Sequence, residues 1–140
     1  MKKQIVTTLI LSLFFLAYSD SGLFAQEPAK AVTKVDVYYF HSTKRCPTCE
    51  AIERETKKTL DNAFAAQMAD GTIKLHILNL EEKANKALVE KYEIAGSSLL
   101  LIPVSGGKAV DLTNKAFLYA KDNSFAFRKE LKEKLTELLK

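Results

Sequence analysis

The chain has 140 residues, 47% of them hydrophobic and 27% charged, and a formal net charge of +4 at pH 7. This length suits one domain, and the composition is that of a globular protein, which excludes a disordered or low-complexity chain. A nucleic-acid-binding protein concentrates Lys and Arg on one face. Here the small positive charge is spread along the sequence, so we exclude nucleic acid as a partner and expect a monomer.

The first 25 residues have the pattern of a secretory signal peptide. Lys2 and Lys3 precede an apolar run over residues 5–18, and Ala25 supplies a small residue at the cleavage point. The run is shorter than the ~20 residues that a membrane span needs. We therefore predict export to the periplasm or a comparable compartment, with an uncleaved membrane anchor as the alternative. The predicted organisation is a signal peptide over 1–25, a short tether over 26–33 and one domain over 34–140.

The domain is predicted to begin with a strand followed by a helix. Residues 35–40 are β-branched and aromatic with a single charge, as in a buried strand. Tyr38 and Tyr39 alternate across this strand, so one is expected in the core and the other outside. Over residues 46–68, apolar side chains recur at steps of three and four, which predicts one long amphipathic helix.

Further elements follow in the same alternation. A strand is predicted over residues 72–80, where apolar and polar residues alternate, and a helix over 81–92, which is rich in helix-forming residues. Residues 99–104 form another apolar strand. Gly106 and Gly107 are typical of a hairpin turn, and 108–112 would be the partner strand.

A final amphipathic helix is predicted to begin with Ser124 as its N-cap, whereas residues 113–123 show no clear pattern. Two strands joined through a helix are expected to be parallel, and two joined by a tight turn antiparallel. The predicted fold is therefore α/β, with a mixed sheet of about four strands that helices flank.

Cys46 and Cys49 are the only cysteines, and they lie in a Cys-Pro-Thr-Cys motif between the first strand and the first helix. Two residues three apart in a helical turn have Cα atoms ~5 to 6 Å apart, which a disulfide can bridge. Pro47 and Thr48 would form the start of the helix, with Pro47 at its first position. Cys46 would then be the N-cap, where free N–H groups and the helix dipole stabilise a thiolate. We predict Cys46 as the nucleophile and Cys49 as the resolving thiol.

Charged neighbours of the motif have two interpretations. Lys44 and Arg45 either tune the Cys46 thiolate with their positive charge or are solvated loop residues. Glu53 is expected to pair with Lys57 one helical turn later, without a catalytic role.

Other uses of the two cysteines remain open. A structural disulfide is one, although a loop this short gives little entropic stabilisation. A zinc site would need His41 and His76 as further ligands, and we predict no such metal site because His76 lies in mid-strand. Cu(I) held by two thiolates is chemically sound, which makes a soft-metal carrier the main alternative. A redox-inert interaction domain is the other.

From Val35 to Lys140, this order of elements around Cys-Pro-Thr-Cys resembles the thioredoxin-like superfamily. The resemblance implies a thiol:disulfide oxidoreductase that acts on protein thiols and disulfides, without a bound cofactor. For an exported member that reduces its substrates, it also implies a membrane electron donor.

The chain departs from the family pattern at several positions. Residues 92–101 are similar to the segment in which a cis-proline precedes the third strand, and Ser98 stands at the proline's place. We therefore predict Ser97 and Ser98 as the substrate loop, with Ser98 beside the disulfide and its peptide bond trans, because a non-proline cis bond costs ~3 to 4 kcal/mol. Arg45 stands at the usual tryptophan, and Phe40 at the position of a buried acid.

Overall fold

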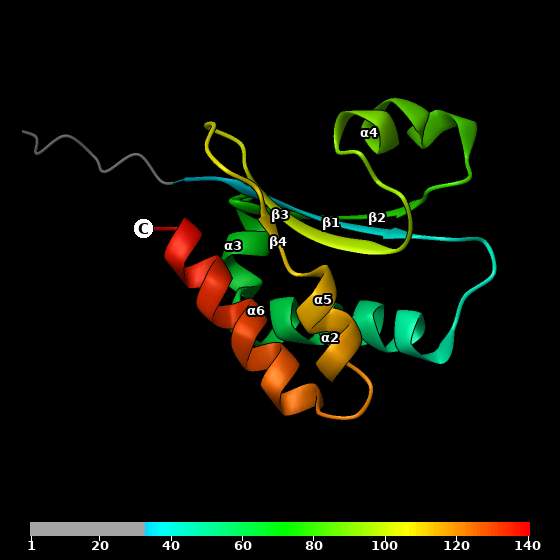
Figure 1. Ribbon diagram of the computed structural model, residues 1–140. Helices are drawn as coiled ribbons and strands as arrows, with labels where there is room; N and C mark the ends of the chain where they lie inside the picture. The colour runs from blue at the N-terminus through cyan, green and yellow to red at the C-terminus, as the bar shows by residue number, and fades with distance from the viewer. Residues whose placement is uncertain (1–32) are drawn as a thin grey trace, which may run out of the picture. The chain divides into compact units, whose positions relative to one another are not determined.

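A computed structural model describes residues 33–140, so the predicted signal peptide and nearly all of the predicted tether lie outside the described residues. Figure 1 shows a sheet with helices on both of its faces. The sheet has four strands in the order β2-β1-β3-β4. Their bounds are β1 Val35–His41, β2 Ile73–Asn79, β3 Ser98–Pro103 and β4 Val110–Asp111.

The sheet is mixed, as predicted, but β3 runs opposite to β2 although a helix joins them. β1 is parallel to β2, with Val35 opposite Ile73, and antiparallel to β3, with Val35 opposite Pro103. β4 is short and pairs antiparallel with β3 at the edge of the sheet. Because β1 lies between β2 and β3, the loop after it leaves from the middle of the sheet.

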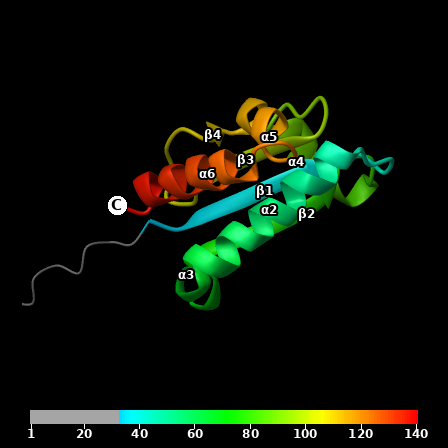
Figure 2. The ribbon, with the colours of Figure 1, turned by 90° about the horizontal axis from the view of Figure 1, so that it is seen from below.

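Helices cover the two faces unequally (Figures 1 and 2). One face carries α2, α5 and α6, which are Pro47–Ala63, Thr113–Tyr119 and Ser124–Leu138, and α3, Ala65–Ala69, follows α2 directly. The other face carries the short α4, Lys86–Lys91, preceded by a 3-10 turn over Lys83–Asn85. Within residues 33–140, none of these helices has the length and hydrophobicity needed to span a membrane.

The core has a large part under α2, α5 and α6 and a smaller part under α4. Val35, Val37 and Tyr39 of β1 point into the large part. Tyr38 and Phe40 point into the smaller part, where they meet Leu100 and side chains of the α4 region. The expectation that one of Tyr38 and Tyr39 faces outward is wrong, because both are buried. A sheet covered on both faces buries successive residues of its central strand.

The predicted helix over 46–68 is two helices. Phe64 has φ −135° and ψ 25°, which are not helical values, and it separates α2 from α3. Its side chain is 5% exposed and joins the large core. The apolar period continues through this break, which is why the sequence shows a single helix.

Two boundaries differ from prediction, and one helix was not predicted. The helix over 81–92 is shortened because Asn79 and Asn85 use their side chains in a turn: Asn79 Oδ1 accepts from the Glu81 N–H, and Asn85 Nδ2 donates to the Asn79 carbonyl. The N-cap of α6 is Asn123, whose Oδ1 accepts from the Ala126 N–H, and Ser124 is the first helical residue. α5 lies in the stretch without a sequence pattern.

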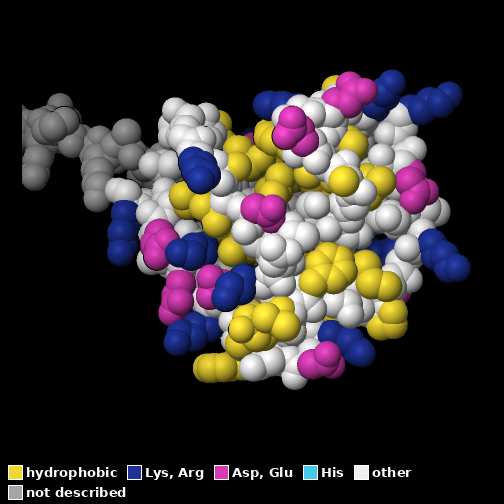
Figure 3. Space-filling model, viewed as in Figure 1, with side chains coloured by type: hydrophobic (Ala, Val, Ile, Leu, Met, Phe, Trp, Pro, Cys, Tyr) yellow, Lys and Arg dark blue, Asp and Glu magenta, His cyan; other side chains and the backbone are white. Residues whose placement is uncertain are grey.

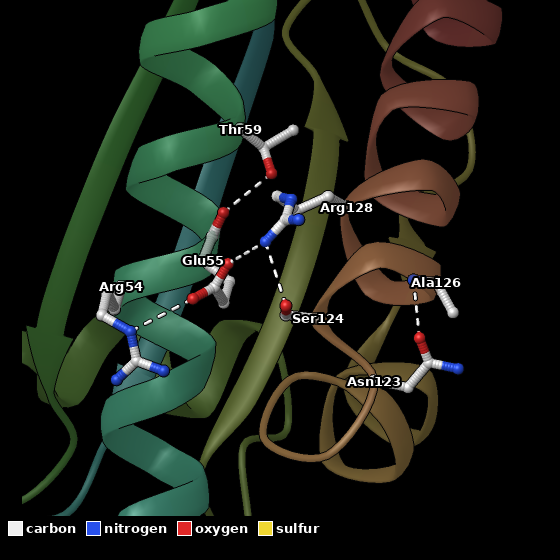
Figure 4. Close-up of polar contacts among 7 residues, drawn as sticks. All are labelled: Arg54, Glu55, Thr59, Asn123, Ser124, Ala126 and Arg128. Atoms are coloured by element: carbon white, nitrogen blue, oxygen red, sulfur yellow. Dashed lines mark hydrogen bonds and ion pairs between the residues drawn. The ribbon is translucent and has the colours of Figure 1, made fainter.

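A polar cluster joins α2 to α6 (Figure 4). The Glu55 carboxylate of α2 is paired with Arg128 of α6 and with Arg54 of its own helix. Ser124 Oγ accepts a hydrogen bond from Arg128. Glu55 is only 6% exposed, and two guanidinium groups compensate its charge.

Candidate active site

The loop that carries the chain from β1 to Cys46 is held by the end of β2. The Leu80 N–H donates to the His41 carbonyl at 2.9 Å. Thr43 is bound twice, because its N–H donates to Glu81 Oε1 at 3.2 Å and its Oγ1 accepts from Asn79 Nδ2 at 2.9 Å. These contacts join segments 36 or more residues apart, so helical or strand periodicity could not reveal them.

Cys46 is the N-cap of α2, as predicted, and Pro47 is at the first helical position. The Cys49 N–H donates to Cys46 Sγ at 3.1 Å, and the Glu50 N–H donates to the Cys46 carbonyl at 3.0 Å. A sulfur atom at this position receives a helix N–H and faces the positive end of the helix dipole. Both effects favour a thiolate over a thiol once the disulfide is reduced.

Cys46 and Cys49 form a disulfide, with their Cα atoms 5.1 Å apart. The two cysteines differ in exposure, since Cys46 is half-buried and Cys49 is 7% exposed. Pro47 is exposed and Thr48 half-buried between them. The arrangement therefore leaves Cys46 the more accessible of the pair to a partner molecule.

Tyr39 lies beneath the motif and was not predicted as a site residue. Its hydroxyl donates to the Cys49 carbonyl at 2.8 Å, and its side chain is fully buried. Burial raises the pKa of Tyr39 above its ordinary value, against the opposing effect of Arg45. Tyr39 is therefore neutral at pH 7 and holds the first turn of α2 as a hydrogen-bond donor.

Arg45 is bound to its neighbours on α2 and β1. Its guanidinium group pairs with Glu53 at 2.6 Å and lies 5.9 Å from the centre of the Tyr39 ring. The predicted pair of Glu53 with Lys57 is also present, at 2.5 Å. Burial raises the pKa of Glu53, but hydrogen bonds from Lys57 and Arg45 lower it by more, so the carboxyl is ionised at neutral pH.

Lys44 is exposed in the loop. Of the two basic residues that would either tune Cys46 or be solvated, Arg45 is thus the one that the fold holds in place. Two of its nitrogen atoms, Nε and Nη2, are buried without a hydrogen-bond partner among residues 33–140. The effect of Arg45 on the Cys46 thiolate remains a prediction.

Ser97, rather than Ser98, makes the polar contact with the disulfide. Ser97 Oγ lies 3.8 Å from Cys49 Sγ. Ser98 begins β3 opposite Phe40, and its hydroxyl donates to the Gly96 carbonyl at 2.9 Å. Residues 33–140 contain no cis peptide bond. Of the two serines predicted as the substrate loop, Ser97 thus makes the polar contact with Cys49, and the Ser98 peptide bond is trans, as predicted.

The two histidines lie in different environments. His76 Nε2 is 3.1 Å from Asp36 Oδ1, and its ring stacks on Tyr38 with the centroids 4.4 Å apart. His41 Nδ1 is 3.0 Å from the Ser42 carbonyl oxygen. In the described part of the chain, no group of three or more His, Cys, Asp or Glu side chains is arranged to hold a metal ion.

The strand topology and the cysteine motif occur together in this chain. The parallel β1–β2 pair, the antiparallel β3–β4 edge and the cysteine pair at the start of the helix after β1 agree with the expected fold, and the structure adds an antiparallel β3 beside β1. The fold is thioredoxin-like. Phe40, at the position of the family's buried acid, is fully buried in the part of the core under α4.

Comparison with known proteins finds structural likeness without a family match. Neither a family model nor a curated protein matches the sequence. The chain is similar to a solved malarial protein, with a TM-score of 0.45 and 20% identity, over 70% of this chain and 98% of that one. It is also similar to a thioredoxin from Thermus thermophilus, with a TM-score of 0.45 and 16% identity, over 74% of this chain and 75% of that one.

Proposed function

We propose that the protein is an exported thiol:disulfide oxidoreductase that exchanges electrons with protein partners through Cys46 and Cys49. The observation that supports this most directly is the position of the disulfide. Cys46 Sγ accepts the Cys49 N–H at the start of α2, where a thiolate is stabilised. A structural disulfide does not require one sulfur to be more accessible than the other, whereas a nucleophile must be reached by its partner.

The exchange proceeds through a mixed disulfide. In the direction of substrate reduction, the Cys46 thiolate attacks one sulfur of a partner disulfide, and the other partner sulfur leaves as a thiolate and takes up a proton. Cys49 then loses its proton to solvent and attacks Cys46 Sγ. The second partner sulfur leaves and is protonated, so the partner has gained two electrons from the protein and two protons from solvent. The reverse sequence oxidises a partner dithiol.

Which direction operates depends on the potential of the Cys46/Cys49 couple relative to its surroundings, where ~30 mV corresponds to ~1.4 kcal/mol. A reductase in an exported compartment needs its dithiol regenerated, so in that direction the proposal includes a membrane electron donor. Equilibration with glutathione mixtures, followed by mass spectrometry of the alkylated protein, gives the potential.

Trapping experiments test the roles of the two cysteines. Cys49→Ser is expected to accumulate mixed disulfides with partner proteins, because the resolving thiol is absent. Cys46→Ser is the matched control and is expected to accumulate none, because Cys49 is 7% exposed. Equal trapping by both variants would contradict the assignment of Cys46 as the nucleophile.

The same variants distinguish the soft-metal alternative. The reduced protein is incubated with Cu(I) under anaerobic conditions and its metal content is measured after desalting. Copper retained by the wild type and lost in both single variants, together with an absence of disulfide exchange, would replace the oxidoreductase proposal with a carrier. A disulfide that neither exchanges nor binds copper after reduction would indicate a redox-inert domain.

A further inference from the structure

A basic groove lies between α2 and α6, which run side by side on one face of the sheet (Figure 2). Its volume is about 320 Å³. Four of its lining side chains are basic and none is acidic. The residues that define this α2–α6 groove are Lys58, Asn62, Phe125, Arg128, Lys129 and Lys132.

The positive charge of the groove is not neutralised by the buried carboxylate of Glu55. Glu55 pairs with the groove residue Arg128, but Glu55 also binds Arg54, so two guanidinium groups share one carboxylate (Figure 4). On the outer side of α6, Lys129 lies 3.9 Å from Glu133 in an exposed pair, which is worth little in water. Lys58 and Lys132 are exposed. The groove therefore keeps a net positive charge.

An aromatic side chain stands beside these charges. Phe125, in the first turn of α6, is 72% exposed, which is the largest exposure among the large hydrophobic residues of the described chain. Figure 3 shows hydrophobic side chains reaching the surface over α5 and the start of α6, where Phe117 and Leu118 are exposed as well. Aromatic rings and arginine are enriched at protein interfaces, and the groove offers one of each in Phe125 and Arg128.

We propose that the α2–α6 groove docks an acidic segment of a protein partner, with one apolar side chain of that segment packed against Phe125. Charge complementarity selects the acidic segment, since the basic lining has no carboxylate to compete with it. The hollow shape favours a peptide over a bilayer, because a flat surface cannot enter a groove between two helices.

This site is separate from the cysteine pair. Thr59, which also lines the groove, lies ten residues after Cys49 on the same helix, which is about 15 Å along the helix axis. A partner bound at the groove would therefore touch a second surface besides the one that meets Cys46. The inference does not depend on the thiol chemistry, because docking requires neither cysteine.

Binding of a labelled peptide to the full-length protein tests the proposal. The probe is a short fluorescent peptide of Asp and Glu with one central Leu, measured by anisotropy at about 0.15 M salt, where charges separated by more than about 8 Å are screened. The matched control peptide has Asn and Gln in place of the acids. We expect the acidic peptide to bind and the amide peptide to bind at least roughly tenfold more weakly.

Two charge-reversal variants with equal net charge distinguish the effect of the groove lysines on peptide binding from the effect of the protein's total charge. K58E/K129E/K132E is expected to weaken binding of the acidic peptide roughly tenfold or more. K74E/K83E/K108E reverses the charge of three exposed lysines outside the groove and is expected to change the affinity for the acidic peptide by less than about twofold. Circular dichroism verifies folding, and if the groove variant is unfolded, K132E alone is measured, with at least a roughly threefold loss expected.

Phe125→Ala tests the apolar contact without changing charge. It is expected to weaken binding roughly threefold to tenfold, whereas Leu118→Ala on α5 leaves it unchanged. The proposal is overturned by an acidic peptide that does not bind, or by equal losses in the two triple variants. If the protein binds vesicles of phosphatidylglycerol and phosphatidylcholine more tightly than the peptide, the partner of the groove is a membrane surface and not an acidic protein segment.

Discussion

Replacing Glu55 by Gln is expected to lower the free energy of unfolding by about 2 kcal/mol at pH 7. The Glu55 carboxylate is 6% exposed and pairs with Arg128 and Arg54. Breaking a fully buried ion pair costs about 3 to 5 kcal/mol. Here the side chains of Arg128 and Arg54 are 30% and 63% exposed, so both reach water when the carboxylate is gone, and the cost falls below that range.

The loss should also depend on pH. Burial raises the pKa of Glu55, but hydrogen bonds from Arg128 and Arg54 lower it by more, so it lies below its ordinary value of 4.5. The unfolded state then binds this proton more readily than the folded state, and the contribution of Glu55 is complete above the unfolded pKa. It is lost as the pH falls through the folded pKa, so wild type and variant should converge in stability in acid.

Urea unfolding followed by circular dichroism, at neutral pH and at several pH values below 4.5, measures both effects. Glu137→Gln on α6 is the matched control, because Glu137 pairs with Lys134 on the exposed side of the helix and no measurable change is expected. A Glu55→Gln variant within about 0.5 kcal/mol of the wild type would refute the reasoning. So would a difference that stays constant from neutral to acidic pH.

Three further predictions concern the motif, the core and the N-terminus. Tyr39→Phe removes the hydrogen bond to the Cys49 carbonyl, so urea unfolding of the oxidised protein should give a free energy of unfolding about 1 kcal/mol lower than that of the wild type. An unchanged free energy of unfolding would mean that the bond does not hold the turn. Leu131→Ala opens a cavity under α6, so the same assay should give a free energy of unfolding lower by about 2 to 5 kcal/mol. A decrease of less than about 1 kcal/mol would contradict the place of Leu131 in the core. N-terminal sequencing of the exported protein should begin at Gln26, and a start at Met1 in the membrane fraction would indicate an anchor instead.

The parts of the site that the sequence predicted are local. Cys46 as N-cap, Pro47 at the first helical position and the bond to Cys49 follow from four consecutive residues and helix geometry. The pair of Glu53 with Lys57 follows from a spacing of one turn. In each case the residues that interact are neighbours in the sequence, so their types and spacing determine the contact.

Contacts between elements could not be predicted in this way. Tyr39 reaches Cys49 only because α2 packs on the face of β1 that carries Tyr39. The contact of Ser97 with Cys49 depends on the exact residue at which β3 begins, so the sequence indicated the segment of Ser97 and Ser98 but not which hydroxyl contacts the sulfur. α5 was missed because it is short and buries a single residue, Ala116, which leaves no repeating apolar pattern.

The alternation of β1 also determines what lies beneath the disulfide. Phe40, which stands at the position of the acid in the resemblance, faces the core under α4. The side chain that β1 presents under α2 is that of Tyr39. Burial raises the pKa of Tyr39, so its hydroxyl stays protonated at pH 7 and donates to the Cys49 carbonyl instead of acting as a base. Its contribution to the motif is therefore positional: it fixes the turn that carries both sulfur atoms.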